Sequence, residues 1–126
     1  MSLGSPLGRV RGLGSAKSGT EHFWMQRVTA VALIPLTLWF IYSVIALTGA
    51  DHAAATAWLQ SPVTAVLMLV LIAATFHHMQ LGLQVVIEDY IHSESMKIAS
   101  LLAMKGATLL LAVAAAFAVL KVAFGG

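Results

Sequence analysis

Two adjacent histidines stand inside a long apolar stretch of this chain, and a carboxylate and a phenol follow them. His77 and His78 interrupt the hydrophobic residues of FHHMQLGLQVVIEDYIH, residues 76–92, which ends with Asp89 and Tyr90 near its last turn. A neutral imidazole can bind a metal ion, for example as an axial ligand of haem iron, and a phenol can donate a hydrogen bond or a proton. These residues are therefore the first candidates for a functional site.

Helical spacing separates the two histidines. Successive residues of a helix turn by about 100°, so residues 4, 7 and 11 positions apart return to nearly the same line. His78, Gly82, Val85 and Asp89 share such a line, whereas His77 points about 100° away. The line offers a nitrogen ligand, then a glycine that lets a flat group approach the backbone, then a carboxyl about 16 Å further along.

Spacing alone leaves two interpretations of His78 open. An ionisable residue inside a membrane span is costly, which makes it a functional candidate. It could equally hydrogen-bond a carbonyl of a neighbouring helix and have a purely structural role, and we expect that role for His77. One histidine cannot build a zinc or di-iron site, but it is enough for haem if another chain supplies the second ligand.

The acidic end of the segment also has two interpretations. Glu88 and Asp89 lie near a helix C-terminus, where the macrodipole disfavours anions by a few tenths to about 1 kcal/mol. Composition favours a solvated interfacial loop, with Tyr90 in the aromatic belt of the membrane. The functional alternative is a phenol donor, supported by a carboxylate, that meets a lipid-soluble carbonyl compound such as a quinone.

The elements that must position these residues are membrane spans. The chain has 126 residues, of which 60% are hydrophobic and 10% charged, with a mean hydropathy of +0.90. We expect an all-α membrane protein with three transmembrane helices at about 25–48, 62–87 and 99–124, each long enough for a core that takes about 20 helical residues. Residues 1–22 are predicted to form a flexible extramembrane arm, and residues 23–126 the three-span anchor domain. The chain has no cysteine, which excludes disulfides and thiolate metal sites.

Local signals refine the ends of the spans. Ser61 and Pro62 predict a helix start, as cap and first helical residue. Thr20 is a candidate for the start of the first helix, and Pro35 predicts a bend inside the first span. Three spans bury little of their own surface, so we expect them to belong to a larger anchor helix bundle with a partner chain.

The positive charges predict the topology. Four of the seven Lys and Arg residues precede or open the first span: Arg9, Arg11, Lys17 and Arg27. We interpret this asymmetry as a topology signal and not as a nucleic-acid-binding surface. It predicts a multi-pass membrane protein with the N-terminus in the cytoplasm or its topological equivalent and the C-terminus outside. The loop 49–61 would then lie outside and the loop 88–98 inside.

Two motifs resemble a known family. His78, Gly82, Asp89 and Tyr90 match an H-x3-G-x6-D-Y pattern, and residues 27–30 read R-V-T-A. Both resemble the small hydrophobic membrane anchor subunit of succinate dehydrogenase, respiratory complex II. The likeness extends over the whole chain, from a basic arm through three spans with the motifs at matching ends.

The resemblance implies specific roles. His78 would be one axial ligand of a b-type haem that is shared with a second anchor subunit of the cytochrome b556 type. Tyr90 would hydrogen-bond a ubiquinone carbonyl with support from Asp89, Arg27 would lie near the haem propionates, and Gly82 would allow the haem to come close. An iron–sulfur subunit and a flavoprotein subunit would complete the complex. The resemblance also implies the inner membrane of a bacterium or mitochondrion, with the N-terminus on the cytoplasmic or matrix side and the C-terminus on the periplasmic or intermembrane side. Electrons would pass from succinate to ubiquinone, and this chain alone would not oxidise succinate.

Two other functions remain open from the sequence. The chain could be the anchor of a fumarate reductase that uses a menaquinone, since the direction of turnover depends on cofactor potentials that the sequence does not contain. It could also be a small membrane scaffold without haem, whose histidines only link helices.

Overall fold

The chain forms an all-helical structure. The computed structural model describes residues 15–125, with side chains from residue 19 onward. Its helices are α2 (Ser15–Ala46), α3 (His52–Gln60), α4 (Pro62–Tyr90) and α5 (Glu94–Ala123), and the described residues contain no strand. Three segments are long and apolar enough to cross a membrane: Gly19–Ala46, Pro62–Tyr90 and Glu94–Ala123. The predicted all-α fold with three spans is therefore confirmed.

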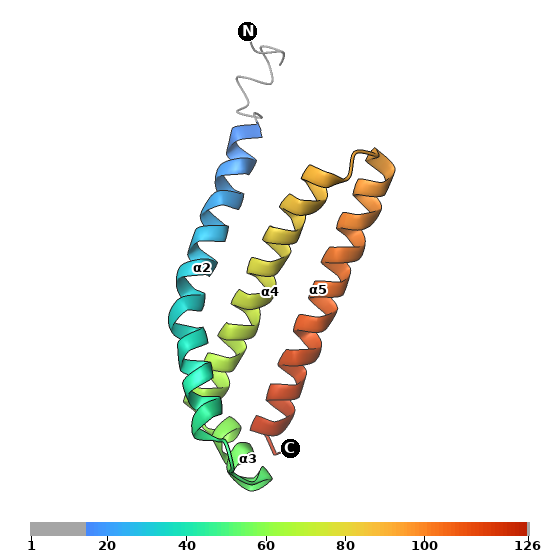
Figure 1. The fold of residues 1–126 in the computed structure, drawn as a ribbon. Coiled ribbons are helices and arrows are strands. Elements are labelled where there is room, and N and C mark those ends of the chain that lie inside the picture. Colours follow the sequence, from blue (N-terminus) through green and yellow to red (C-terminus); the bar gives the residue numbers. More distant parts are fainter. Residues whose placement is uncertain (1–14, 126) are drawn as a thin grey trace.

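The three long helices run in alternating directions in a row (Figure 1). Helix α4 lies in the middle and contacts both α2 and α5, whereas α2 and α5 do not pack against each other over the described ranges. The short helix α3 lies at the end of the bundle where α2 ends and α4 begins, and it contacts α4 and α5. The beginning of α2, the end of α4 and the beginning of α5 consequently meet at one end of the molecule.

Local signals explain where the helices begin and end. Helix α4 begins at Pro62 with Ser61 as its N-cap, as predicted. The turn after α2 contains Gly49 at φ 83°, a left-handed conformation that glycine adopts without steric cost. Helix α5 begins after Ser93, whose hydroxyl accepts a hydrogen bond from the Met96 N–H.

The helices extend beyond several of the predicted spans. Helix α2 includes Ser15 and so begins before Thr20, and residues 1–14 of the expected arm lie outside the described residues. Helix α5 begins at residue 94 rather than 99, because the Ser93 cap starts a helix in the polar residues before the apolar run. Pro35 lies inside α2 as expected, and the bend at this residue stays a prediction. The division into an arm at 1–22 and an anchor domain at 23–126 also stays a prediction.

A short helix also occupies the predicted loop between the first two spans. The N-cap of helix α3 is Asp51, whose Oδ1 accepts a hydrogen bond of 2.9 Å from the Ala54 N–H. Trp58 of α3 stacks on Trp39 of α2 with ring centroids 5.8 Å apart. These contacts hold α3 across the end of the bundle that lies opposite the candidate site.

Small residues mediate the contacts between the long helices. The buried side chains are those of Thr29, Ser43, Thr64, Ala74, Leu81, Thr108 and Val119. Small side chains let helix backbones approach closely, which is how helices associate in lipid. Large apolar side chains point outward in contrast, for example Leu110 at 70% exposure and Phe117 at 64%. Most of the apolar surface is thus free to contact lipid or other subunits.

Candidate functional site

A cavity between α2 and α4 brings two predicted site residues together. It has a volume of about 400 Å³ and lies beside the first half of α2. Its lining comprises Gly19, His22, Phe23, Gln26, Arg27 and Ala30 from α2, with His78 and Val85 from α4. His78 and Arg27, 51 positions apart in the sequence, therefore line the same cavity. We call this space the His78 cavity.

The side chain of His78 is held by α2. It is half-buried, and its Nδ1 lies 3.0 Å from the Thr29 hydroxyl. That hydroxyl also donates to the Met25 carbonyl oxygen at 2.7 Å, within α2. The orientation of the imidazole is thus fixed by a buried residue of another helix, and its second nitrogen, Nε2, makes no hydrogen bond to a described residue.

His77 points elsewhere, as the helical spacing predicted. It lines two other hollows, one with Glu21 and His22 of α2 and one with Lys105 of α5. It makes no hydrogen bond within the described part of the chain. The bond to a neighbouring helix that we expected of a structural histidine is made instead by His22, whose Nε2 lies 3.3 Å from the Leu81 carbonyl oxygen.

The line through His78, Gly82 and Val85 faces α2. A Cβ built on Gly82 would lie 3.9 Å from Gln26 Nε2, which is ordinary van der Waals contact. The side chain of Gln26 therefore lies beside this glycine and leaves room for a methyl group. Gln26 Oε1 is buried and has no hydrogen-bond partner among the described residues. Buried polar atoms are usually satisfied, so this oxygen is an exception within the site.

Arg27 lies at the edge of the cavity. Its guanidinium lies 4.8 Å from the centroid of the Phe23 ring, close enough for a cation–π interaction. Within the described residues it forms no ion pair. The positive charge therefore remains available to an anionic group that enters the cavity.

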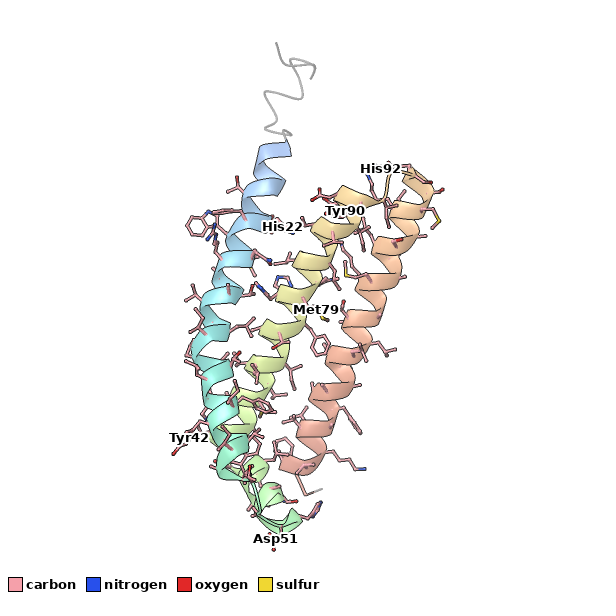
Figure 2. The ribbon with its side chains drawn as sticks, in the orientation of Figure 1. His22, Tyr42, Asp51, Met79, Tyr90 and His92 are labelled. Carbon is pink, nitrogen blue, oxygen red and sulfur yellow. The ribbon has the colours of Figure 1, made fainter. Side chains whose placement is uncertain are left out.

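Asp89 and Tyr90 lie outside the His78 cavity. They occupy the last turn of α4 and are exposed, Tyr90 at 78%. Neither side chain hydrogen-bonds to a described residue, whereas Glu88 accepts a bond of 2.8 Å from Gln84. Figure 2 shows Tyr90 at the same end of the bundle as His22. By helical rise, Tyr90 stands about 18 Å along α4 from His78. The structure thus places the two candidate groups at one end but does not join them.

Sequence reasoning missed three residues of this region. Phe23 and Gln26 line the cavity, and Thr29 holds His78. Positions 22, 26 and 29 follow the spacing of one helix face, so a polar face of α2 was detectable in the sequence. The described residues contain no group of three or more His, Cys, Asp or Glu side chains that could hold a metal ion.

Comparison with known protein families identifies the family of this chain. A family model of the succinate dehydrogenase/fumarate reductase transmembrane subunit matches residues 1–120. The chain belongs to this family. It is a membrane anchor subunit of the succinate dehydrogenase or fumarate reductase type, and the resemblance seen in the two motifs is confirmed.

Individual relatives agree with this family. The succinate dehydrogenase hydrophobic membrane anchor subunit of Rickettsia bellii is 34% identical over 97 residues, which are 77% of this chain and 78% of the relative. That of Paracoccus denitrificans is 32% identical over 95 residues, 75% of this chain and 74% of the relative. The succinate dehydrogenase membrane anchor subunit of Reclinomonas americana is 27% identical over 88 residues, 68% and 73% of the two chains. No solved structure matches the chain.

Proposed function

We propose that this anchor supplies one axial ligand to a b-type haem and part of the ubiquinone-reduction site of a succinate:ubiquinone oxidoreductase. The observation that carries the proposal is that His78 and Arg27 line the same cavity. Membership of the family supports the presence of partner subunits, since an anchor subunit works within a complex. We assign the second haem ligand to a second anchor subunit.

The residues of the His78 cavity fit a haem. A half-buried imidazole with one free nitrogen is a suitable axial ligand, and Phe23, Ala30 and Val85 offer apolar surface for a flat macrocycle. When bound, the haem would supply a one-electron redox centre beside the quinone site. This chain contributes the ligand, a shielded environment and nearby charge, which are the means by which a protein tunes such a group.

Arg27 suits the propionate groups. A guanidinium forms charge-assisted, often bidentate hydrogen bonds with carboxylates. Arg27 lines the same cavity as His78 and forms no ion pair with a carboxylate among the described residues. We assign it to the haem propionates, whose negative charge it would offset.

Tyr90 and Asp89 suit the quinone. The Tyr90 phenol is exposed at the end of α4 and can donate to a quinone carbonyl oxygen, which accumulates negative charge on reduction. Asp89, the residue before it, is the carboxylate that we assign to supporting this phenol. Because both side chains lie outside the cavity, the remaining quinone contacts are assigned to partner subunits.

The complex would contain a flavoprotein subunit and an iron–sulfur subunit on the cytoplasmic or matrix side. Electrons from succinate would reach ubiquinone at the membrane face where α4 ends, so this chain anchors the complex and helps to form the quinone site. By itself it would oxidise nothing.

A Tyr90→Phe variant of the whole complex tests the quinone role. Loss of the phenol proton donor should slow succinate-to-ubiquinone turnover on the order of 100-fold. Succinate oxidation by an artificial dye that accepts electrons upstream of the membrane should stay unchanged. An equal loss with both acceptors, or no loss with ubiquinone, would contradict the assignment of Tyr90.

A fumarate reductase that uses menaquinone is the second candidate, because the matched family includes both enzymes. Assays of the same complex with a low-potential and a high-potential quinone decide between them. Faster succinate oxidation with the high-potential quinone supports the main proposal, and faster fumarate reduction with the low-potential quinol supports the alternative.

A further inference from the structure

The buried hydroxyl of Thr29 sits among three polar atoms. Thr29 is 6% exposed, and its Oγ1 lies 2.7 Å from the Met25 carbonyl oxygen and 3.1 Å from that of Gln26. The third neighbour is His78 Nδ1 of helix α4, at 3.0 Å. Each of these contacts requires a particular hydrogen-bond donor. The position of the hydroxyl proton therefore determines whether Nδ1 of His78 must carry a proton.

One placement of the protons makes all three contacts of the Thr29 hydroxyl hydrogen bonds. A hydroxyl has a single proton and two acceptor lone pairs, and a carbonyl oxygen can only accept. The two carbonyl contacts within α2 therefore need the Thr29 proton, in the bond to a preceding carbonyl that threonine commonly makes within a helix. The contact with His78 is then a hydrogen bond only if Nδ1 carries a proton and donates to Oγ1.

We infer that Thr29 is a positioning residue that fixes the tautomer of His78. With the proton on Nδ1, a neutral imidazole has its lone pair on Nε2, the nitrogen without a hydrogen-bond partner among the described residues. Thr29 thereby presents Nε2 as the nitrogen for the haem iron. This inference rests on the proposed function of His78 and adds a residue to which the motif R-V-T-A alone gave no role.

The same bond predicts a direction for the redox potential. A hydrogen bond accepted from Nδ1–H raises the basicity of an axial imidazole and strengthens its donation to the metal. Stronger donation favours the oxidised iron, so loss of the Thr29 acceptor should raise the midpoint potential of the haem. It should also weaken retention of the haem, since loss of such a partner typically reduces metal affinity by about 10–100-fold.

Helix α5 offers a matched control. Thr108 is 5% exposed, and its hydroxyl lies 2.9 Å and 3.1 Å from the carbonyl oxygens of Met104 and Lys105. It makes the same bonds within its helix as Thr29 but no bond to a histidine. Thr108→Val therefore removes an equivalent buried hydroxyl and leaves His78 unaffected.

The experiment compares the purified complex carrying Thr29→Val, Thr29→Ser or Thr108→Val with wild type. The readouts are the haem midpoint potential from a spectroscopic redox titration and the rate of haem transfer to apomyoglobin, with flavin content as the measure of assembly. We expect Thr29→Val to raise the potential and to lose haem about tenfold faster or more. Thr29→Ser and Thr108→Val should both match wild type.

Unchanged potential and haem transfer in Thr29→Val would overturn the inference, as would equal changes in Thr108→Val. If Thr29→Val reduces assembly, Thr29→Ala removes the hydroxyl without adding bulk and is held to the same expectation. These outcomes are distinct from failure of the proposed function, which would appear as an absence of haem from the wild-type complex or as an unchanged haem in His78→Ala.

Discussion

At the scale of single residues, the direction in which each histidine points separates their roles. His78 faces α2 and shares a cavity with Arg27, whereas His77 lines hollows on other sides of α4. Helical geometry predicted this divergence from adjacency alone. The contacts of Thr29 and Gln26 with α4 could not be predicted in the same way, because the sequence does not specify which face of α2 meets α4.

Gly82 provides a residue-scale prediction. The space beside it is sufficient for a methyl group, since a Cβ would lie 3.9 Å from Gln26 Nε2. Gly82→Ala should therefore leave assembly intact and favour the helix by roughly 0.5–1 kcal/mol. If a haem comes close to this backbone, the same variant should lose haem relative to flavin.

Gly106→Ala is the control for Gly82→Ala. Gly106 lies inside α5, and nothing within 4 Å would meet its added Cβ. It should change neither haem nor flavin content, both of which can be measured by absorption of the purified complex. A haem content in Gly82→Ala equal to that of Gly106→Ala would mean that Gly82 serves helix packing alone.

At the scale of elements, the apolar runs predicted the spans but not the full helices. Helix α4 starts at the predicted Pro62 and continues to Tyr90, past the predicted end at 87. Hydrophobicity marks the part of a helix inside lipid, while the ends depend on caps and can extend through polar residues. This extension matters because it puts Asp89 and Tyr90 in the last helical turn rather than in a loop.

Helix α3 shows the same limit of sequence reasoning. Helix α3 has only nine residues, most of them small, so the sequence shows no apolar periodicity that predicts it. The signal that was present is the Asp51 cap, which accepts the Ala54 N–H. The Trp39–Trp58 stacking that holds the helix links separate elements and depends on how the chain turns between them. Local caps were therefore predictable here, and the packing was not.

At the scale of the whole molecule, three helices in one row leave both faces of α4 partly open. Only Ala74, Leu81 and Val119 are buried among the apolar side chains described. Helices in lipid associate through packing of small residues, and this chain buries few side chains of its own. The prediction that the spans belong to a larger anchor bundle agrees with this arrangement and stays a prediction, as does the orientation in the membrane.

The orientation is tested by reporter fusions in a bacterial inner membrane. The structure puts the α4–α5 connection at the end of the bundle where α2 begins, and the α2–α4 connection at the opposite end (Figure 1). Because the basic residues precede the first span, alkaline phosphatase fused after residue 51 or after residue 126 should be active. A fusion after residue 92 should be inactive, and the reverse pattern would contradict the predicted topology.

The central claim is that His78, and not its neighbour, holds a haem. The most direct measurement is the dithionite-reduced minus oxidised visible spectrum of the purified complex, with wild type beside His78→Ala and His77→Ala and flavin content as the control for assembly. We predict a b-type absorption band in wild type and His77→Ala, and its loss in His78→Ala with flavin retained. A full band in His78→Ala, or no haem band in wild type, would contradict the claim and leave His78 as a residue that links α4 to α2.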